Sequence, residues 1–94
     1  MSVARVATWD EPPDLRDDDD RRSKSLYDLL QSLPGFIVGY YLREATTGRL
    51  MSVTVWESEE ALEAAEQAVR ERPVSDQRGI RPSRVERWIV EASL

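Results

Sequence analysis

The sequence predicts an α+β fold of the ferredoxin-like type, in which a four-stranded antiparallel sheet carries two helices on one face. Segments with strand periodicity and segments with helical periodicity follow one another in the order βαββαβ. A short Thr/Gly turn joins the two middle strands, which makes them antiparallel neighbours. The chain has 94 residues and no internal repeat, so residues 1–94 are expected to form a single domain.

The first half is predicted to contain two strands separated by one helix. Residues 3–9 have the composition of a strand, which an acidic, Pro-containing breaker ends. Leucines at helical spacing predict a helix over 17–33, which Pro34 and Gly35 terminate. Residues 36–43 form the second strand. Strict alternation there gives one row of Phe36, Val38, Tyr40 and Leu42, and another of Ile37, Gly39, Tyr41 and Arg43.

The third strand, residues 50–56, has two rows of different character. One row is apolar (Met51, Val53, Val55), and the other combines small polar side chains with an indole (Ser52, Thr54, Trp56). The polar row either lines a cavity next to Trp56 or is simply solvated on an exposed sheet face. Ser58 is a good N-cap for an alanine-rich helix that Pro73 ends, and residues 85–90 form the last strand.

Residue types that the sequence lacks exclude several chemistries. The chain has no Cys and no His, so it has no disulfide, thiolate nucleophile, imidazole base or His ligand for haem. The lack of Cys favours a cytoplasmic location. No apolar run reaches the roughly 18 residues of a membrane span, so no membrane partner is expected. The net charge of −5 is concentrated in the helical segments, which argues against nucleic acid as a partner.

The acidic run at residues 17–20, which Arg21 and Arg22 follow, has two interpretations. It could hold a metal ion, or it could be the first turn of a helix with carboxylate and arginine side chains paired at i,i+4. Consecutive carboxylates point around a helix instead of converging on one ion. The second interpretation is therefore favoured, and no metal or other cofactor is predicted.

The helix-free face of the predicted sheet is apolar, so we expect another surface to pack against it and bury it. Such a patch is larger than a soluble monomer normally exposes, and a domain of this size gains stability from a partner chain. We therefore predict a homodimer in which two such faces pack together. Residues expected on this face are Ile37, Tyr41, Met51, Val53 and Val55.

Three motifs in this order resemble the antibiotic biosynthesis monooxygenase (ABM) family of dimeric α/β barrels. They are Leu33-Pro34-Gly35-Phe36, the turn Thr47-Gly48-Arg49, and the run VWESEEAL from Val55 to Leu62. The resemblance covers nearly the whole chain. It implies a homodimer whose two sheets form a barrel, with a pocket between the helices and the sheet of each subunit. Trp56 matches the pocket tryptophan of the family.

The resemblance implies cofactor-independent oxygenation of an aromatic or polyketide-like compound. Such a site must bind a flat ring, help to remove a proton and stabilise the resulting anion. Trp56, Phe36 and Tyr40 are expected to contact the ring, while Thr54 and Ser52 are expected to form hydrogen bonds with it. For Trp56, a role as a core anchor is an equally good interpretation.

The chain departs from the family in one respect. Many members carry a His near the positions that residues 64–67 occupy here, so haem degradation is disfavoured. The proton acceptor would have to be Asp10, Glu57, Glu66, a Tyr or solvent. Arg5 either neutralises a substrate anion or forms a rim salt bridge. The alternative function is a non-catalytic, dimeric ligand-binding or stress-associated module with a vestigial pocket.

Overall fold

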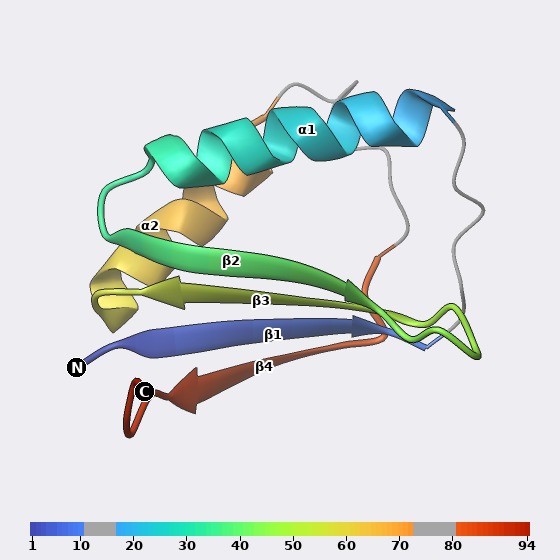
Figure 1. Cartoon of the computed structure of the whole chain (residues 1–94). Helices are drawn as coiled ribbons and strands as arrows, with labels where there is room; N and C mark the ends of the chain where they lie inside the picture. The colour runs from blue at the N-terminus through green and yellow to red at the C-terminus, as the bar shows by residue number, and fades with distance from the viewer. Residues whose placement is uncertain (11–16, 73–80) are drawn as a thin grey trace.

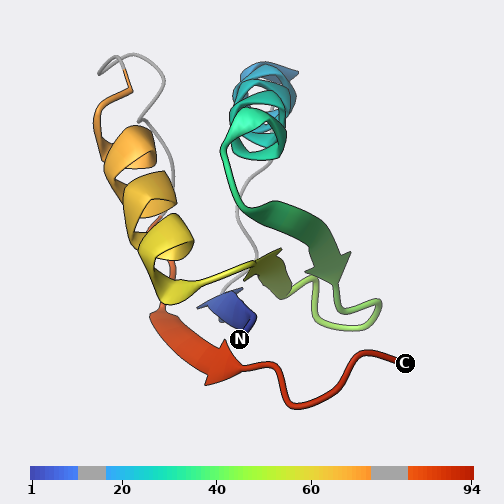
Figure 2. The same ribbon diagram turned by 90° about the vertical axis from the view of Figure 1, so that its left-hand side faces the viewer.

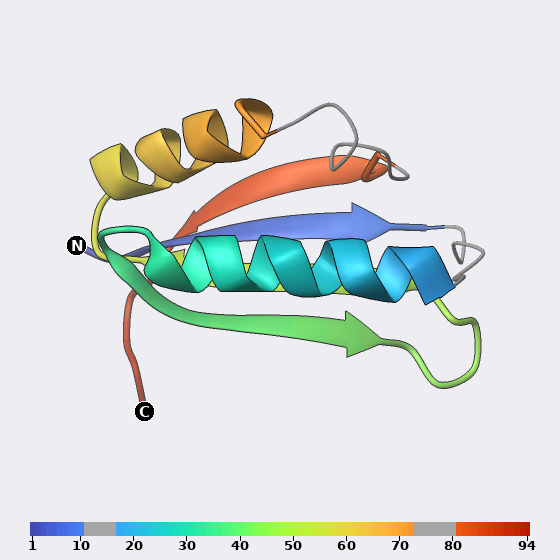
Figure 3. The same cartoon turned by 90° about the horizontal axis from the view of Figure 1, so that it is seen from above.

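The computed structural model describes residues 1–10, 17–72 and 81–94, except for the side chains of residues 17–23. The elements are β1 (Val3–Trp9), α1 (Asp17–Ser32), β2 (Phe36–Arg43), β3 (Leu50–Trp56), α2 (Glu59–Arg70) and β4 (Arg84–Ile89) (Figure 1). The strands form one antiparallel sheet in the order β2-β3-β1-β4. Both helices lie on the same side of this sheet (Figures 2 and 3). The predicted ferredoxin-like α+β fold is therefore confirmed.

The strand register divides the side chains between a helix-covered face and a helix-free face. On the helix-covered face, cross-strand neighbours form sets that we call rungs. The first rung is apolar, the second contains two arginines, and the third has no charged residue. The first rung is Phe36, Trp56, Val3 and Ile89; the second is Gly39, Thr54, Arg5 and Arg87; the third is Tyr41, Ser52, Ala7 and Val85.

A β-bulge near the start of β2 decides which tyrosine faces the helices. The pairing register shifts between Phe36 and Val38, which makes Ile37 an extra residue in the strand. Strict alternation predicts Tyr40 in the row of Phe36 and Tyr41 on the helix-free face, and both placements are wrong. Because of the bulge, Tyr41 lies on the helix-covered face and Tyr40 on the helix-free face.

The core lies at the first rung, beneath the beginning of α2. Trp56 and Leu62 are each 1% exposed, and Ala65 is nearly as deeply buried. The ring of Phe36 meets the indole edge-on, with 5.4 Å between the ring centroids. Other partly buried side chains that complete this cluster are Val3, Leu30, Leu33 and Ala61.

Local signals hold α2 close to the turn that precedes β2. The predicted N-cap is confirmed, because Ser58 Oγ accepts a hydrogen bond from the backbone N–H of Ala61 at 3.1 Å. Gly35 has a φ of 85°. A Cβ atom at this position would lie 2.6 Å from the Cβ of Ala61, so only glycine fits here without displacing α2.

The helix-free face carries large apolar side chains that no element of the described chain covers. Tyr40 and Trp88 are each 56% exposed, and Leu42 is 47% exposed. The central strands contribute less exposed aliphatic side chains to the same surface. The members of this face that the register identifies are Val6, Val38, Tyr40, Leu42, Met51, Val53, Val55 and Trp88.

Two further expectations concern metals and membranes. The acidic run at 17–20, with Arg21 and Arg22, lies outside the described side chains, so neither interpretation of it is tested. In the described part of the chain, no group of three or more acidic side chains is placed to hold a metal ion. No helix in that part is long and apolar enough to cross a membrane.

Candidate functional site

All the predicted site residues except Tyr40 lie on the helix-covered face. Trp56 and Phe36 belong to the first rung, Thr54 to the second and Ser52 to the third. Thr54 and Ser52 are 6% and 4% exposed, respectively. The polar row of β3 is therefore buried beneath the helices and is not solvated on an open face. Tyr40 lies on the other side of the sheet, away from these residues.

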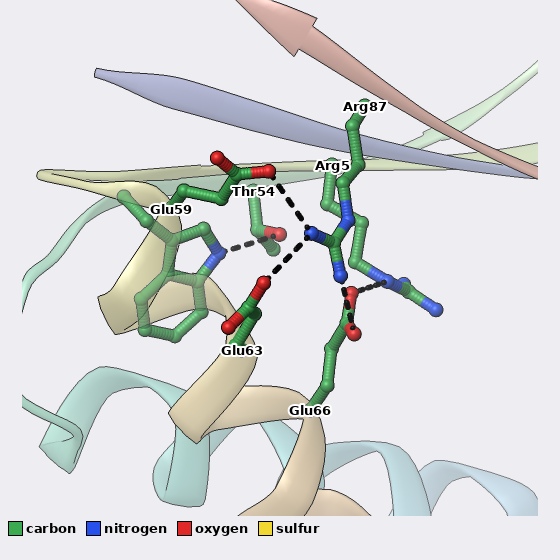
Figure 4. Close-up of polar contacts among 7 residues, drawn as sticks. Arg5, Thr54, Glu59, Glu63, Glu66 and Arg87 are labelled. Carbon is green, nitrogen blue, oxygen red and sulfur yellow. Dashed lines mark hydrogen bonds and ion pairs between the residues drawn. The ribbon is translucent and has the colours of Figure 1, made fainter. Parts of the chain in front are cut away.

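The side chain of Trp56 makes its contacts with other residues of the protein core. Its Nε1–H donates a hydrogen bond to Thr54 Oγ1 at 3.0 Å, which Figure 4 marks with a dashed line. This bond satisfies the only polar group of the indole. Trp56 thus serves as a core anchor in this structure, and contact between Trp56 and a substrate stays a prediction.

A cavity of about 200 Å³ lies between the C-terminal end of α1 and the small side chains of α2. It is smaller than the roughly 300–1,000 Å³ of typical ligand pockets, so it accommodates only part of a multi-ring compound. Trp56 is not among its lining residues. These are Leu33, Pro34, Gly35, Glu57, Ala61, Ala64 and Ala65.

A charge cluster joins the second rung to α2 (Figure 4). Arg87 Nη2 lies 2.9 Å from Glu66 Oε2, and Arg87 Nη1 lies 3.5 Å from Glu59 and 3.6 Å from Glu63. These carboxylates, with Glu66 foremost, raise the pKa of Arg87. Arg5 Nε lies 3.5 Å from Glu66 Oε1. Each carboxylate oxygen of Glu66 therefore faces a different arginine.

The guanidinium of Arg5 has fewer hydrogen-bond and ion-pair partners among the described residues than that of Arg87. Its Nε is buried and has no hydrogen-bond acceptor among the described residues, because the contact with Glu66 lacks hydrogen-bond geometry. The side chain as a whole is 31% exposed. An unsatisfied buried donor costs about 1–3 kcal/mol, so a position of this kind needs an explanation.

Two tyrosines extend the helix-covered face beyond the second rung. The rings of Tyr27 in α1 and Tyr41 in β2 are tilted by 45°, with 4.2 Å between their centroids. Burial, and then the charge of Tyr27, raise the pKa of Tyr41 to about 12, although Arg5 and Arg72 act in the opposite direction. At neutral pH, Tyr41 is therefore a protonated phenol, which can donate a hydrogen bond.

Sequence reasoning missed both tyrosines as site residues, for different reasons. Tyr27 lies three residues before Leu30, so helical spacing could have placed it on the buried stripe of α1. Tyr41 was placed on the wrong face because the bulge at Ile37 leaves no signal in the alternation of the strand.

A second cavity, of about 240 Å³, lies at the opposite end of the strands from Trp56. The buried Thr8 Oγ1 has no hydrogen-bond partner among the described residues. No residue predicted for the functional site lines this cavity. Its lining residues are Thr8, Leu42, Arg43, Glu44, Arg49, Leu50 and Met51.

No model of a known protein family matches the chain, and no curated protein matches it. Solved structures do match over almost the whole length. A heme-degrading protein from Mycobacterium tuberculosis is 20% identical, with a TM-score of 0.72, and the match covers 100% of this chain and 99% of that one. A mutant of SnoaB, a cofactor-independent oxygenase from Streptomyces nogalater, is 14% identical, with a TM-score of 0.70 and coverage of 99% and 96%.

Identities of this size establish likeness of fold. Both matches extend over the sheet and the helices, and both cover nearly all of the matched chains. The βαββαβ fold that the resemblance to the ABM family implies is therefore the fold observed.

Proposed function

We propose that this chain binds a flat, electron-rich aromatic or polyketide-like compound on the helix-covered face and oxygenates it without a bound cofactor. The observation that carries the proposal is the arrangement at the second and third rungs, where Arg5 and Tyr41 share the helix-covered face with the small residues Gly39, Ser52 and Ala7, and the ring of Tyr27 in α1 contacts that of Tyr41. Proteins of the same fold include a heme-degrading protein and a cofactor-independent oxygenase, which supports small-molecule oxygenation in general.

The donors of this chain do not fit a haem iron. The sequence contains neither His nor Cys, which are the usual protein ligands of haem together with Met and Tyr. The pKa of Tyr41, raised to about 12, opposes formation of the phenolate that iron prefers. We therefore propose cofactor-independent oxygenation and not haem degradation.

The proposed reaction uses molecular oxygen as its only co-reactant. An acidic phenol or anthrone loses a proton, and the resulting anion passes one electron to oxygen. Combination of the two radicals forms a carbon–oxygen bond. Loss of water then leaves a ketone or quinone, so one oxygen atom enters the product and the other leaves as water. The protein must only bind the ring and stabilise the anion.

The residues at the second and third rungs have distinct roles in this scheme. Tyr27 and Tyr41 hold the ring of the substrate, and the hydroxyl of Tyr41 donates a hydrogen bond to a substrate oxygen. The guanidinium of Arg5 stabilises the negative charge that develops when the proton leaves. Ser52, which is buried next to Tyr41 in the third rung, gives the ring room because its side chain is small.

The proton is assigned to solvent, although the sequence offers three carboxylates as acceptors. Glu66 is the one that meets Arg5, but both of its oxygens are already engaged by arginines. Asp10 lies at the far end of β1, and Glu57 lines the small cavity beside α2. Neither forms an ion pair with Arg5 in the described part of the chain.

Oxygen uptake tests the proposal. The purified chain, with no cofactor added, is expected to consume one molecule of oxygen for each molecule of a hydroquinone or anthrone that it converts. Tyr41→Phe is expected to slow this reaction, whereas Tyr40→Phe, a matched change on the helix-free face, is not. Stoichiometric haem or flavin in the active protein contradicts the proposal. Ring binding without oxygen uptake identifies the non-catalytic module instead.

The proposal includes a homodimer that forms through the helix-free face. Its exposed Tyr40, Leu42 and Trp88 form part of an apolar surface that a second copy of the chain would cover. Val53→Asp, near the middle of this face, is expected to dissociate the dimer in sedimentation experiments. Ala45→Asp, in the exposed hairpin, places the same charge elsewhere as a control. A wild-type monomer at micromolar concentration contradicts this part of the proposal.

A further inference from the structure

The environment of Arg5 indicates the class of compound that the proposed site accepts. We propose that the ligand carries a carboxylate or a similar anionic group next to its ring, and that Arg5 recognises this group. The inference rests on the proposed function for the location of the site. It goes further because it assigns a charge to the ligand and names the residue that selects it.

The first argument compares two arginines that are neighbours in the second rung. Arg5 and Arg87 face each other across β1 and β4, where like charges repel. Arg87 balances its charge with three glutamates of α2. Arg5 meets one of these, Glu66, and does so through Nε at 3.5 Å. Most of the negative charge of these glutamates therefore compensates the charge of Arg87 and not that of Arg5.

The second argument concerns the terminal nitrogens of Arg5. They form no hydrogen bond or ion pair with any described residue, and Figure 4 shows this guanidinium extending to the side away from Arg87. The side chain is 31% exposed although its Nε is buried, so the exposed surface of Arg5 belongs to its other atoms. A guanidinium in this state matches a carboxylate, which accepts two parallel hydrogen bonds from it.

The third argument is that charge and aromatic surface occur together. Arg5 and Tyr41 occupy adjacent rungs of the helix-covered face, and Arg5 lowers the pKa of Tyr41 against the larger effect of burial. Arg72 acts on Tyr41 in the same direction and adds positive potential. The ring of Tyr27 in α1 contacts that of Tyr41 in a tilted arrangement. A compound with an anionic group next to a flat ring satisfies both features at once.

Two isosteric probes that cannot be oxidised in this reaction test the inference. We expect the full chain to bind 2-naphthoate at least about tenfold more tightly than 2-naphthamide in calorimetry at neutral pH, because charge-assisted hydrogen bonds are the stronger kind. Arg5→Gln is expected to remove this preference and to leave the affinity for 2-naphthamide unchanged. Arg5→Lys, which keeps the charge without the planar fork, is expected to retain part of the preference.

Arg49→Gln is the matched control. Arg49 is about half exposed and pairs with Glu44 in the hairpin, so its substitution removes the same charge far from the site. It is expected to leave the naphthoate preference intact. Circular dichroism and thermal unfolding establish that each variant is folded.

The outcomes separate this inference from the proposed function. Equal affinity for the two probes, binding of neither probe, or a preference that persists in folded Arg5→Gln overturns the role of Arg5. Oxygen uptake is measured independently with neutral hydroquinones. Oxygen uptake together with equal probe binding overturns only the anion inference. A naphthoate preference that Arg5→Gln removes, without oxygen uptake from any hydroquinone, overturns only the oxygenase activity.

Discussion

The two ends of the helix-covered face differ in how completely their side chains are satisfied. At one end, which we call the packed end, Trp56, Leu62 and Ala65 are buried, and the indole N–H has a partner. At the other, the polar end, Arg5 has a buried donor that finds no acceptor among the described residues, and Tyr41 is 43% exposed. The difference indicates that one end supplies stability, while the other remains able to exchange its present contacts for those of a ligand.

The largest effect is expected from Trp56→Ala at the packed end. Removing a fully buried indole leaves a cavity, so the free energy of unfolding should fall by about 3–5 kcal/mol in chemical denaturation. Tyr41→Ala at the polar end should cost much less, because its ring is 43% exposed. Equal losses in the two variants would show that the two ends contribute alike to stability.

A smaller loss is expected from Gly35→Ala, which tests how tightly the packed end is closed. The new Cβ would lie 2.6 Å from the Cβ of Ala61 at a φ of 85°, so steric overlap adds to backbone strain. We expect a loss of about 1–3 kcal/mol in the free energy of unfolding. Gly48→Ala, at a φ of 76° in the hairpin, measures the contribution of a positive φ. A cost no greater at Gly35 than at Gly48 would contradict the close approach.

At the polar end, the free energy of unfolding should depend on the ionisation of Tyr41 at alkaline pH. Its pKa is about 12 in the folded chain and about 10 in the unfolded chain. Between these values the unfolded state binds fewer protons, so stability falls as the pH rises from about 10 to about 12.

Urea denaturation across this pH range measures the effect. Tyr41→Phe should flatten this part of the pH dependence, whereas Tyr40→Phe should leave the contribution of Tyr41 in place. A slope that persists unchanged in Tyr41→Phe would show that another group is responsible.

The smallest change in the free energy of unfolding is expected from a substitution in the hairpin between β2 and β3, which belongs to neither the packed end nor the polar end. Glu44 and Arg49 lie 3.0 Å apart, and each side chain is about half exposed. Glu44→Gln should change the free energy of unfolding by less than about 0.5 kcal/mol, and this change should vanish at high salt. Glu66→Gln, which removes a carboxylate that meets two arginines, should cost more. A reversed order would mean that the second rung gains nothing from its ion pairs.

Much of the fold is predictable from the sequence because its signals are local. The breaker after Trp9, the Pro34-Gly35 stop and the Ser58 cap each act within a few residues, so the observed strands and helices begin and end close to their predicted bounds. The order of these elements then leaves few ways to arrange a four-stranded sheet.

The site was less predictable because it depends on contacts between distant residues. The bond between Trp56 and Thr54 follows from side-chain rotamers, and residue types do not specify these. The unequal pairing of Arg5 and Arg87 follows from the register between β1 and β4, which are far apart in the chain. No periodicity in either strand contains that information.

The bulge at Ile37 has a consequence for tracing the ancestry of the chain. A relative that lost one codon here would have a regular strand, yet its equivalent of Tyr41 would still face the helices. An ungapped alignment of the two genes would instead match Tyr40 with that residue and would confuse a tyrosine of the helix-free face with one of the helix-covered face. A single-residue gap at Ile37 restores the structural equivalence, and mutational histories of the two adjacent tyrosines are meaningful only after that gap is placed.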